Sequence, residues 1–169
     1  HLVAATPDFI SLWPKSSELE FGSTLRQKSS IVEDELLIES PIDERAMGLI
    51  KSAWCTEMWY EEEDLRNIEK TLGVTPGDVN SRTDLIAWLL LAAREVLLRD
   101  DVFADEHLGY VAELAGMLDK TRARVRAGCK EDLLNLVQVR NVGRNRARTL
   151  SKMGIRTPAD LLSMGNKQL

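Results

Sequence analysis

Hydroxyl–proline pairs divide this sequence into helical segments. A hydroxyl side chain at the N-cap, followed by proline at the first helical position, is typical of a helix start, because the N–H that proline lacks has no helical partner there. Gly73 and Gly154 follow helical patterns and suit left-handed C-caps. The chain therefore reads as a series of capped helices. The pairs are Thr6-Pro7, Ser40-Pro41, Thr75-Pro76 and Thr157-Pro158.

The spacing of apolar residues predicts an all-α fold. No segment alternates for long like a strand, and residues 29–38 are the least clear. The helix from Pro76 is apolar nearly all round, which is typical of a central helix in a bundle. We expect helices near residues 7–13, 17–38, 41–60, 62–72, 76–99, 104–127, 131–138, 144–153 and 158–163.

A boundary near Gly128 separates a helical bundle at residues 1–128 from a small hairpin domain at 129–169. Apolar residues make up 44% of the chain, which is enough for a packed core. We expect the hairpin domain to have a small core of its own. Its predicted members are Val137, Val142, Ala147, Leu150 and Ile155.

The C-terminal region resembles a helix-hairpin-helix, a module that usually grips a nucleic-acid backbone through main-chain N–H groups. Its turn needs Gly or Asn where φ is positive, and Asn141 and Gly143 occupy the two expected places. Most versions of the module have Gly at both. Basic residues decorate the second helix, and Arg144 and Arg148 share a face. The predicted DNA contacts here are Arg140, Asn141, Gly143, Arg144, Arg146, Arg148 and Lys152. The alternative is a protein–protein module.

Charge is distributed unevenly along the chain. The net charge is -5, yet residues 120–156 contain eleven Lys or Arg and two acids, whereas residues 17–64 contain thirteen acids and four bases. This asymmetry favours a polyanion site near the C-terminus; the alternative is two solvated helical faces. Arg122 and Arg126 extend the basic face or form a solvated helix end. The acidic run at 61–64 caps the next helix and needs no further role.

Trp88 has two interpretations. An aromatic side chain on a helix can stack on a single-stranded base, and Arg82, six residues earlier and close to the same side, could meet a phosphate. Judged from the residues alone, core packing is favoured for Trp88. Trp13, Trp54 and Trp59 lack basic neighbours at helical spacing, and we expect them to serve core or inter-domain packing.

Several functional classes lack their sequence signals. There is no phosphate-binding loop, no Asp-Glu-x-His box, no zinc-ligand spacing and no catalytic constellation, so we expect no catalysis by this chain alone. The absence of a clustered acidic metal site argues against a nuclease.

The longest uncharged run of the most apolar helix has nine residues, far short of a bilayer span. Two lone cysteines favour a reducing compartment. The abrupt ends suggest a piece of a longer protein.

The order of several motifs resembles the C-terminal part of the archaeal Ski2-like superfamily-two DNA repair helicases, relatives of the helicase portion of DNA polymerase theta. The resemblance covers nearly the whole chain. It rests on the residues from His1 to Asp8, Thr75 to Val79, Trp88-Leu89, Arg124 to Leu134 and Val139 to Arg148.

The resemblance implies a ratchet-like bundle followed by the helix-hairpin-helix domain. In that family an arginine and a tryptophan of a long bundle helix contact the 3′ single strand; Trp88 matches the tryptophan, and the arginine position falls on Ser81, one residue before Arg82. Arg146-Ala147-Arg148 matches an arginine motif of the final domain, which binds the emerging strand and restrains the motor.

The resemblance also implies the cellular setting. The parent protein would be an ATP-dependent 3′–5′ helicase, with ATP and Mg in its motor domains and no cofactor in this part. The implied partners are single-stranded or forked DNA and the motor domains of the same polypeptide, and no membrane is involved. The protein would be monomeric, cytoplasmic and associated with the nucleoid. The alternative is a non-enzymatic helix-hairpin-helix module that docks on another protein.

Overall fold

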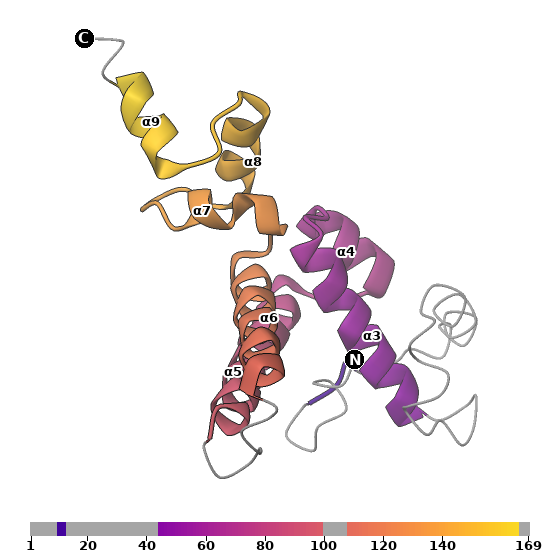
Figure 1. The fold of residues 1–169 in the computed structure, drawn as a ribbon. Coiled ribbons are helices and arrows are strands. Elements are labelled where there is room, and N and C mark those ends of the chain that lie inside the picture. The colour runs from indigo at the N-terminus through magenta and orange to yellow at the C-terminus, as the bar shows by residue number, and fades with distance from the viewer. Residues whose placement is uncertain (1–9, 13–43, 100–107, 166–169) are drawn as a thin grey trace.

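The computed structural model describes residues 10–12, 44–99 and 108–165, and every regular element in this part of the chain is a helix (Figure 1). The all-α prediction is confirmed. The expected helix at 17–38 and the helix start at Pro41 lie outside the described residues. The elements are α3 (Glu44–Tyr60), α4 (Leu65–Leu72), α5 (Pro76–Leu97), α6 (Leu108–Ala127), the 3-10 helix η4 (Glu131–Leu133), α7 (Leu134–Val137), α8 (Arg144–Lys152) and α9 (Pro158–Gly165).

The predicted helix caps explain where α4 and α5 end and begin. Gly73 closes α4 with a left-handed φ of 61°, and its N–H donates to the carbonyl of Glu69. Thr75 and Asp78 form a reciprocal capping box at the start of α5, since each side chain accepts a hydrogen bond from the other residue's backbone N–H. Where they are described, the helix ends agree with the predictions to within three residues.

The segment Ile10–Leu12 is not helical, so the expected helix at 7–13 is wrong at these residues. The N–H of Leu12 donates to Oγ of Ser52 at 2.7 Å instead of to a helical carbonyl. The Leu12 side chain is buried in a cluster of α3 and α4 residues. This tertiary contact with α3 replaces the local hydrogen bonds of a helix.

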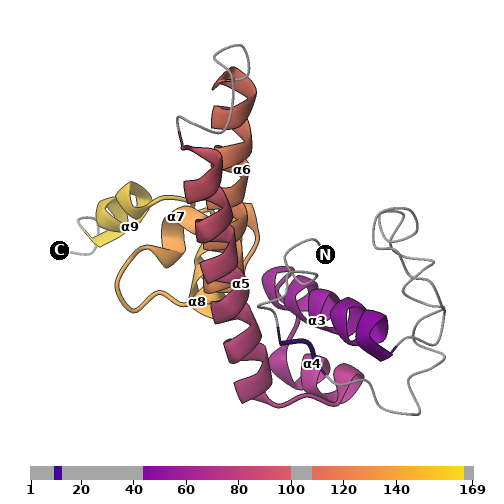
Figure 2. The ribbon, with the colours of Figure 1, turned by 90° about the horizontal axis from the view of Figure 1, so that it is seen from below.

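The long helices α5 and α6 run side by side, and α3 and α4 pack against one end of this pair (Figures 1 and 2). One apolar cluster joins α5 to α6 through Ile86, Leu90 and Val125. A second cluster joins α3, α4 and the start of α5 through Cys55, Ile68 and other residues. Burial of these side chains holds the bundle together.

Helix α5 is not covered all round, contrary to the sequence prediction. Ile86, Leu89 and Leu90 are buried, but Trp88 and Val96 on other sides of the helix are exposed. The other described helices cover only part of its circumference. A surface of α5 that contains Trp88 is therefore open to a ligand.

The hairpin region at the end of α6 has its own apolar cluster, as expected. Cys129, Leu133, Leu136, Ala147 and Ile155 form its buried centre, and Val137, Val142 and Leu150 pack against it. All five predicted core residues belong to this cluster. Its position beyond α6 brings the hairpin beside the turn between α3 and α4 (Figure 1).

Candidate nucleic-acid interface

The hairpin turn between α7 and α8 has one left-handed residue. Asn141 has φ of 66°, as predicted, and the N–H of Val142 donates to the carbonyl of Val139 at 3.0 Å. Gly143 has φ of −81° and ψ of 173°, so the expected positive φ at this position is wrong. Gly143 is the extended N-cap of α8, and a single left-handed residue is enough to reverse the chain.

The N-terminus of α8 is open. Gly143 provides no side-chain cap, and a Cβ atom at this position would meet no atom within 4 Å. The first backbone N–H groups of a helix have no helical acceptor, and the helix dipole makes this end attractive to an anion. The turn therefore has the geometry by which a helix-hairpin-helix faces a phosphate.

Arg140 and Arg146 lie at this open edge. Arg146 donates through Nη1 to the carbonyl of Asn141 at 2.7 Å, which holds its guanidinium beside the turn. Both side chains are exposed, and neither forms an ion pair with any residue in the described ranges. Lys152, in the last turn of α8, is also exposed. These cations are available to a polyanion.

Arg148 is held by two carboxylates. Its Nε and Nη2 donate to the two oxygens of Glu62 at 2.7 and 2.6 Å, and its Nη1 and Nη2 donate to those of Asp132 at 2.7 and 3.1 Å. These hydrogen bonds raise the pKa of Arg148. Burial alone would raise the pKa of Glu62, but the hydrogen bonds from Arg148 and the backbone N–H of Lys130 bring it below its ordinary value.

Arg144 lies against the aromatic ring of Trp59, with its guanidinium carbon 4.0 Å from the ring centroid. Its Nη1 donates to the carbonyl of Trp59 at 3.1 Å, and its Nη2 donates to the carbonyl of Glu63 at 3.1 Å. Burial lowers its pKa from the ordinary value, although a guanidinium stays protonated at neutral pH. The sequence predicts DNA contacts for Arg144 and Arg148; in this structure both contact the bundle, and the DNA role stays a prediction.

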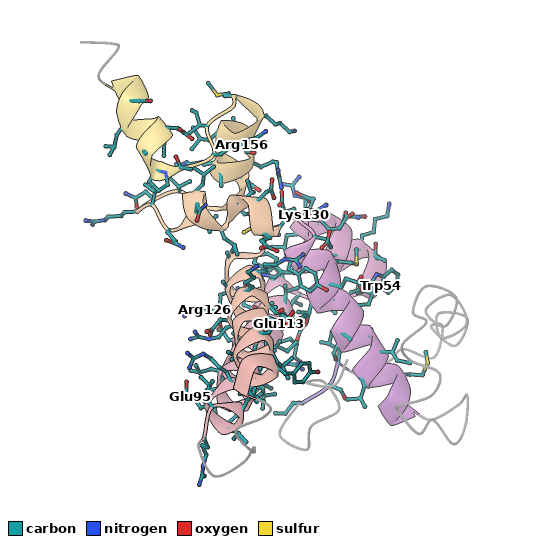
Figure 3. The ribbon with its side chains drawn as sticks, viewed as in Figure 1. Trp54, Glu95, Glu113, Arg126, Lys130 and Arg156 are labelled. Carbon is teal, nitrogen blue, oxygen red and sulfur yellow. The ribbon has the colours of Figure 1, made fainter. Side chains whose placement is uncertain are left out.

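Each of these arginines has one partner in the acidic run Glu61–Asp64, which we call the acidic turn: Arg148 binds the Glu62 carboxylate, and Arg144 binds the backbone carbonyl of Glu63. Asp64 caps α4 as expected, since its carboxylate accepts from the N–H of Arg66 at 2.9 Å. The expectation of no further role is wrong. Glu61 pairs with Arg124 at 2.6 Å and with Lys130 at 3.2 Å, and Glu62 holds Arg148. Figure 3 shows Lys130 where the hairpin region meets the end of α3, with Arg156 farther out beside α8.

Gly128 and Trp59 complete the contact between the two regions. The chain leaves α6 at Gly128 with φ of 63°, and a Cβ atom there would lie 2.6 Å from Cζ2 of Trp59. The indole N–H of Trp59 donates to the carbonyl of Val125 at 2.8 Å. The predicted packing role of Trp59 is confirmed. In the sequence, the one signal for this close approach of Trp59 to the backbone is the glycine at the end of the α6 helical pattern.

Trp88 is 57% exposed, so the core-packing interpretation is wrong. Ser81, seven residues earlier, lies within about 20° of the same direction on the helix, whereas Arg82 lies about 120° away. The expectation that Arg82 lies on the same side of α5 as Trp88 is therefore wrong for the backbone position of Arg82. Its side chain bridges part of the gap, because Nη1 of Arg82 donates to Oγ of Ser81 at 3.0 Å.

Other candidate groups have ordinary surroundings. Arg126 is exposed and Arg122 is half-buried on α6, where the basic end of the helix continues. Cys55 and Cys129 are buried and form no disulfide, and burial raises the pKa of each thiol to about 11. Among the described residues, no cluster of three His, Cys, Asp or Glu side chains could hold a metal ion. No helix in the described part of the chain is long and apolar enough to span a bilayer.

The described residues form a helical bundle followed by a small hairpin of α7 and α8. The family model described as archaeal helicase, domain 4, matches residues 1–128. Because this match covers more than half of the chain, the chain belongs to the archaeal helicase domain 4 family. The resemblance to archaeal Ski2-like DNA helicases is confirmed.

Three relatives support this assignment, and each is an ATP-dependent DNA helicase Hel308. The protein from Thermococcus kodakarensis is 30% identical over 99% of this chain and 14% of its own length. The protein from Pyrococcus horikoshii is 28% identical over 98% of this chain and 22% of its own length. The protein from Pyrobaculum calidifontis is 38% identical over 70% of this chain and 16% of its own length. The chain thus spans between about a seventh and about a fifth of these relatives.

Proposed function

We propose that this chain is the DNA-binding and regulatory C-terminal part of an ATP-dependent 3′–5′ DNA helicase that acts in replication-fork repair. The observation that carries the proposal is the open N-terminus of α8, flanked by Arg140 and Arg146, in a chain of a helicase family. Motor domains of the same polypeptide would supply ATP and Mg chemistry. The chain would act as a monomer in the cytoplasm, associated with the nucleoid.

The two regions would contact the single strand differently. The turn and the start of α8 offer N–H groups and guanidinium groups to phosphates. The exposed Trp88 face of α5 also contains Asp84 and Glu95, which repel phosphates. A base could stack on the Trp88 indole while its phosphate points away from these carboxylates. The bundle would stack on bases through Trp88, and the hairpin would bind the phosphate backbone of the strand.

Salt dependence tests the proposal directly. Phosphate contacts release counterions, so affinity for a single strand or a fork should fall steeply as salt increases. The measurement is fluorescence anisotropy of a labelled oligonucleotide with the full chain at several salt concentrations. A flat response, or no binding at low salt, would contradict the proposal.

Replacement of Trp88 tests the stacking surface. Because Trp88 is exposed, Trp88→Ala should leave the unfolding midpoint nearly unchanged and weaken single-strand binding by roughly 1 to 3 kcal/mol. Val96→Ala, at another exposed apolar position of α5, is the matched control and should leave binding unchanged. Equal losses from both variants would remove the stacking role.

The second candidate is a protein-interaction module, which the contact of Arg144 and Arg148 with the acidic turn favours. Arg148 already binds two carboxylates of the protein, and Arg144 binds backbone carbonyl oxygens beside them. A module of this kind would bind an acidic protein segment more tightly than DNA at the same salt concentration. Parallel titrations with an oligonucleotide and with a poly-glutamate peptide distinguish the two functions.

A further inference from the structure

The arginines of the hairpin form two pairs that point in different directions. Arg144 and Arg148 are four residues apart on α8 and share the face that contacts the acidic turn. Arg146 lies between them in the sequence and about 160° from each around the helix. Its guanidinium reaches the turn at Asn141, next to Arg140.

Arg148 has little left to offer a phosphate. A guanidinium has five N–H donors. The two bidentate pairs that Arg148 forms with Glu62 and Asp132 use four of them. A phosphate approaching Arg148 would meet two carboxylates that already neutralise it. Repulsion from these carboxylates opposes the replacement of either pair.

Arg144 is enclosed by the bundle. The ring of Trp59 covers one face of its guanidinium, and carbonyl oxygens of Trp59, Gly128 and Glu63 accept its N–H groups at 3.1, 3.4 and 3.1 Å. Three carbonyl acceptors and one aromatic face leave its planar head group committed to a single geometry.

Glu62 binds two separate segments of the hairpin region. Glu62 has φ of 72°, its side chain is 15% exposed, and its Oε1 also accepts the backbone N–H of Lys130 at 2.9 Å. The same carboxylate therefore holds α8 through Arg148 and the start of the hairpin region through Lys130. Two attachments to separate segments restrain both the position and the rotation of the hairpin.

We propose that Arg144 and Arg148 are positioning residues that fix the hairpin against the acidic turn, and that Arg140 and Arg146 make the phosphate contacts. The second half rests on the proposed DNA-binding function. The arginine pair on one face of α8 sets the direction in which the open turn points, and the other pair engages the strand.

The positioning role is tested without DNA by a double-mutant cycle. Glu62→Gln and Arg148→Gln should each lower the urea midpoint of the full chain, and the double variant should lose little more than the worse single variant. Arg148→Lys keeps the charge but cannot make two bidentate pairs, so it should behave like Arg148→Gln. Additive losses, or a wild-type midpoint for Arg148→Lys, would overturn the positioning role.

The phosphate role is tested by the salt dependence of single-strand binding. Arg140→Gln and Arg146→Gln should each reduce the slope of log affinity against log salt by about 0.7, the value for one phosphate contact to a single strand. Arg144→Gln and Arg148→Gln should lower affinity and leave the slope unchanged. Lys70→Gln, an exposed cation in the last turn of α4, controls for the loss of one charge.

The outcomes separate the two halves. Equal slope losses for Arg148→Gln and Arg146→Gln would overturn the division between the pairs. If the wild-type chain binds no DNA at low salt, the proposed function and the phosphate contacts both fail. The double-mutant cycle still decides whether Arg148 positions the hairpin through Glu62.

Discussion

At the scale of single residues, Gly128 has little freedom to change. Its φ of 63° is in the left-handed region, and Trp59 occupies the space that a side chain would need. The indole cannot easily move, because its N–H is bonded to Val125 and its ring faces Arg144. One glycine therefore lets α6, α3 and α8 meet.

Gly128→Ala should destabilise the chain by about 2 to 4 kcal/mol, the sum of a left-handed alanine and an overpacked indole. Gly154→Ala is the matched control, because Gly154 has φ of 86° but a Cβ atom added there would meet nothing within 4 Å. It should cost only about 1 kcal/mol. Urea denaturation measures both, and equal losses would show that the contact with Trp59 contributes nothing.

Asn141→Gly tests the turn. Asn141 is left-handed, so glycine should relieve backbone strain and stabilise the chain by a few tenths of a kcal/mol, or about 0.5 kcal/mol at most. Glycine should also let a phosphate approach the backbone, which predicts equal or tighter single-strand binding. Asn141→Val should weaken both, and denaturation with anisotropy checks the pair. Weaker binding by Asn141→Gly would indicate that the amide itself contacts the ligand.

At the scale of elements, the helices begin and end where local capping satisfies their backbone. The capping box of Thr75 and Asp78 starts α5, and Thr157 and Asp160 make the same contacts at the start of α9. Helix α8 differs, because Gly143 leaves its start without a side-chain cap. The open N-terminus of α8 is the one that we propose as a phosphate site.

Thr75→Ala should destabilise the chain by about 1 kcal/mol, because the N–H of Asp78 loses its acceptor. Thr75→Ser keeps the hydroxyl and should cost much less. Thermal unfolding of the three proteins measures the difference. A full-size loss for Thr75→Ser would show that the threonine methyl group, not the cap, carries the effect.

At the scale of the whole molecule, two regions of opposite charge meet at the acidic turn. Arg148 lowers the pKa of Asp132, and it lowers that of Glu62 against the opposing effect of burial. Both carboxyl groups bind protons less readily in the folded chain. The stability that they contribute is therefore complete above their ordinary pKa values, which are 4.5 for Glu62 and 3.8 for Asp132. It is lost as the pH falls through the lowered values.

Acid should therefore weaken the contact between the hairpin and the bundle. The urea midpoint should fall as the pH drops below about 4.5, the ordinary pKa of the Glu62 carboxyl group. This fall should be smaller in the double variant Glu62→Gln with Asp132→Asn. Glu113→Gln, an exposed carboxylate on α6, is the control and should keep the wild-type pH dependence. An unchanged pH dependence in the double variant would show that these carboxylates do not couple to folding.

Much of the local structure could be predicted from the sequence. The proline caps located the starts of α5 and α9, Asn141 marked the left-handed turn, and the apolar residues of the hairpin formed the expected cluster. The caps and the turn depend on neighbours within about one helical turn, and the cluster follows from the helical spacing of apolar residues. The same local reasoning placed Arg82 beside Trp88 wrongly, because six residues do not complete a whole number of turns.

The sequence by itself determined the all-α class, most of the described helix boundaries and the basic character of the hairpin, because capping, periodicity and charge act between near neighbours. Only the tertiary structure decided which arginines contact the bundle and that Trp88 is exposed. Glu62 and Arg148 are 86 residues apart, and no local pattern encodes their meeting. Such a contact depends on how whole helices pack, since the burial of distant apolar clusters sets the positions of the charged groups.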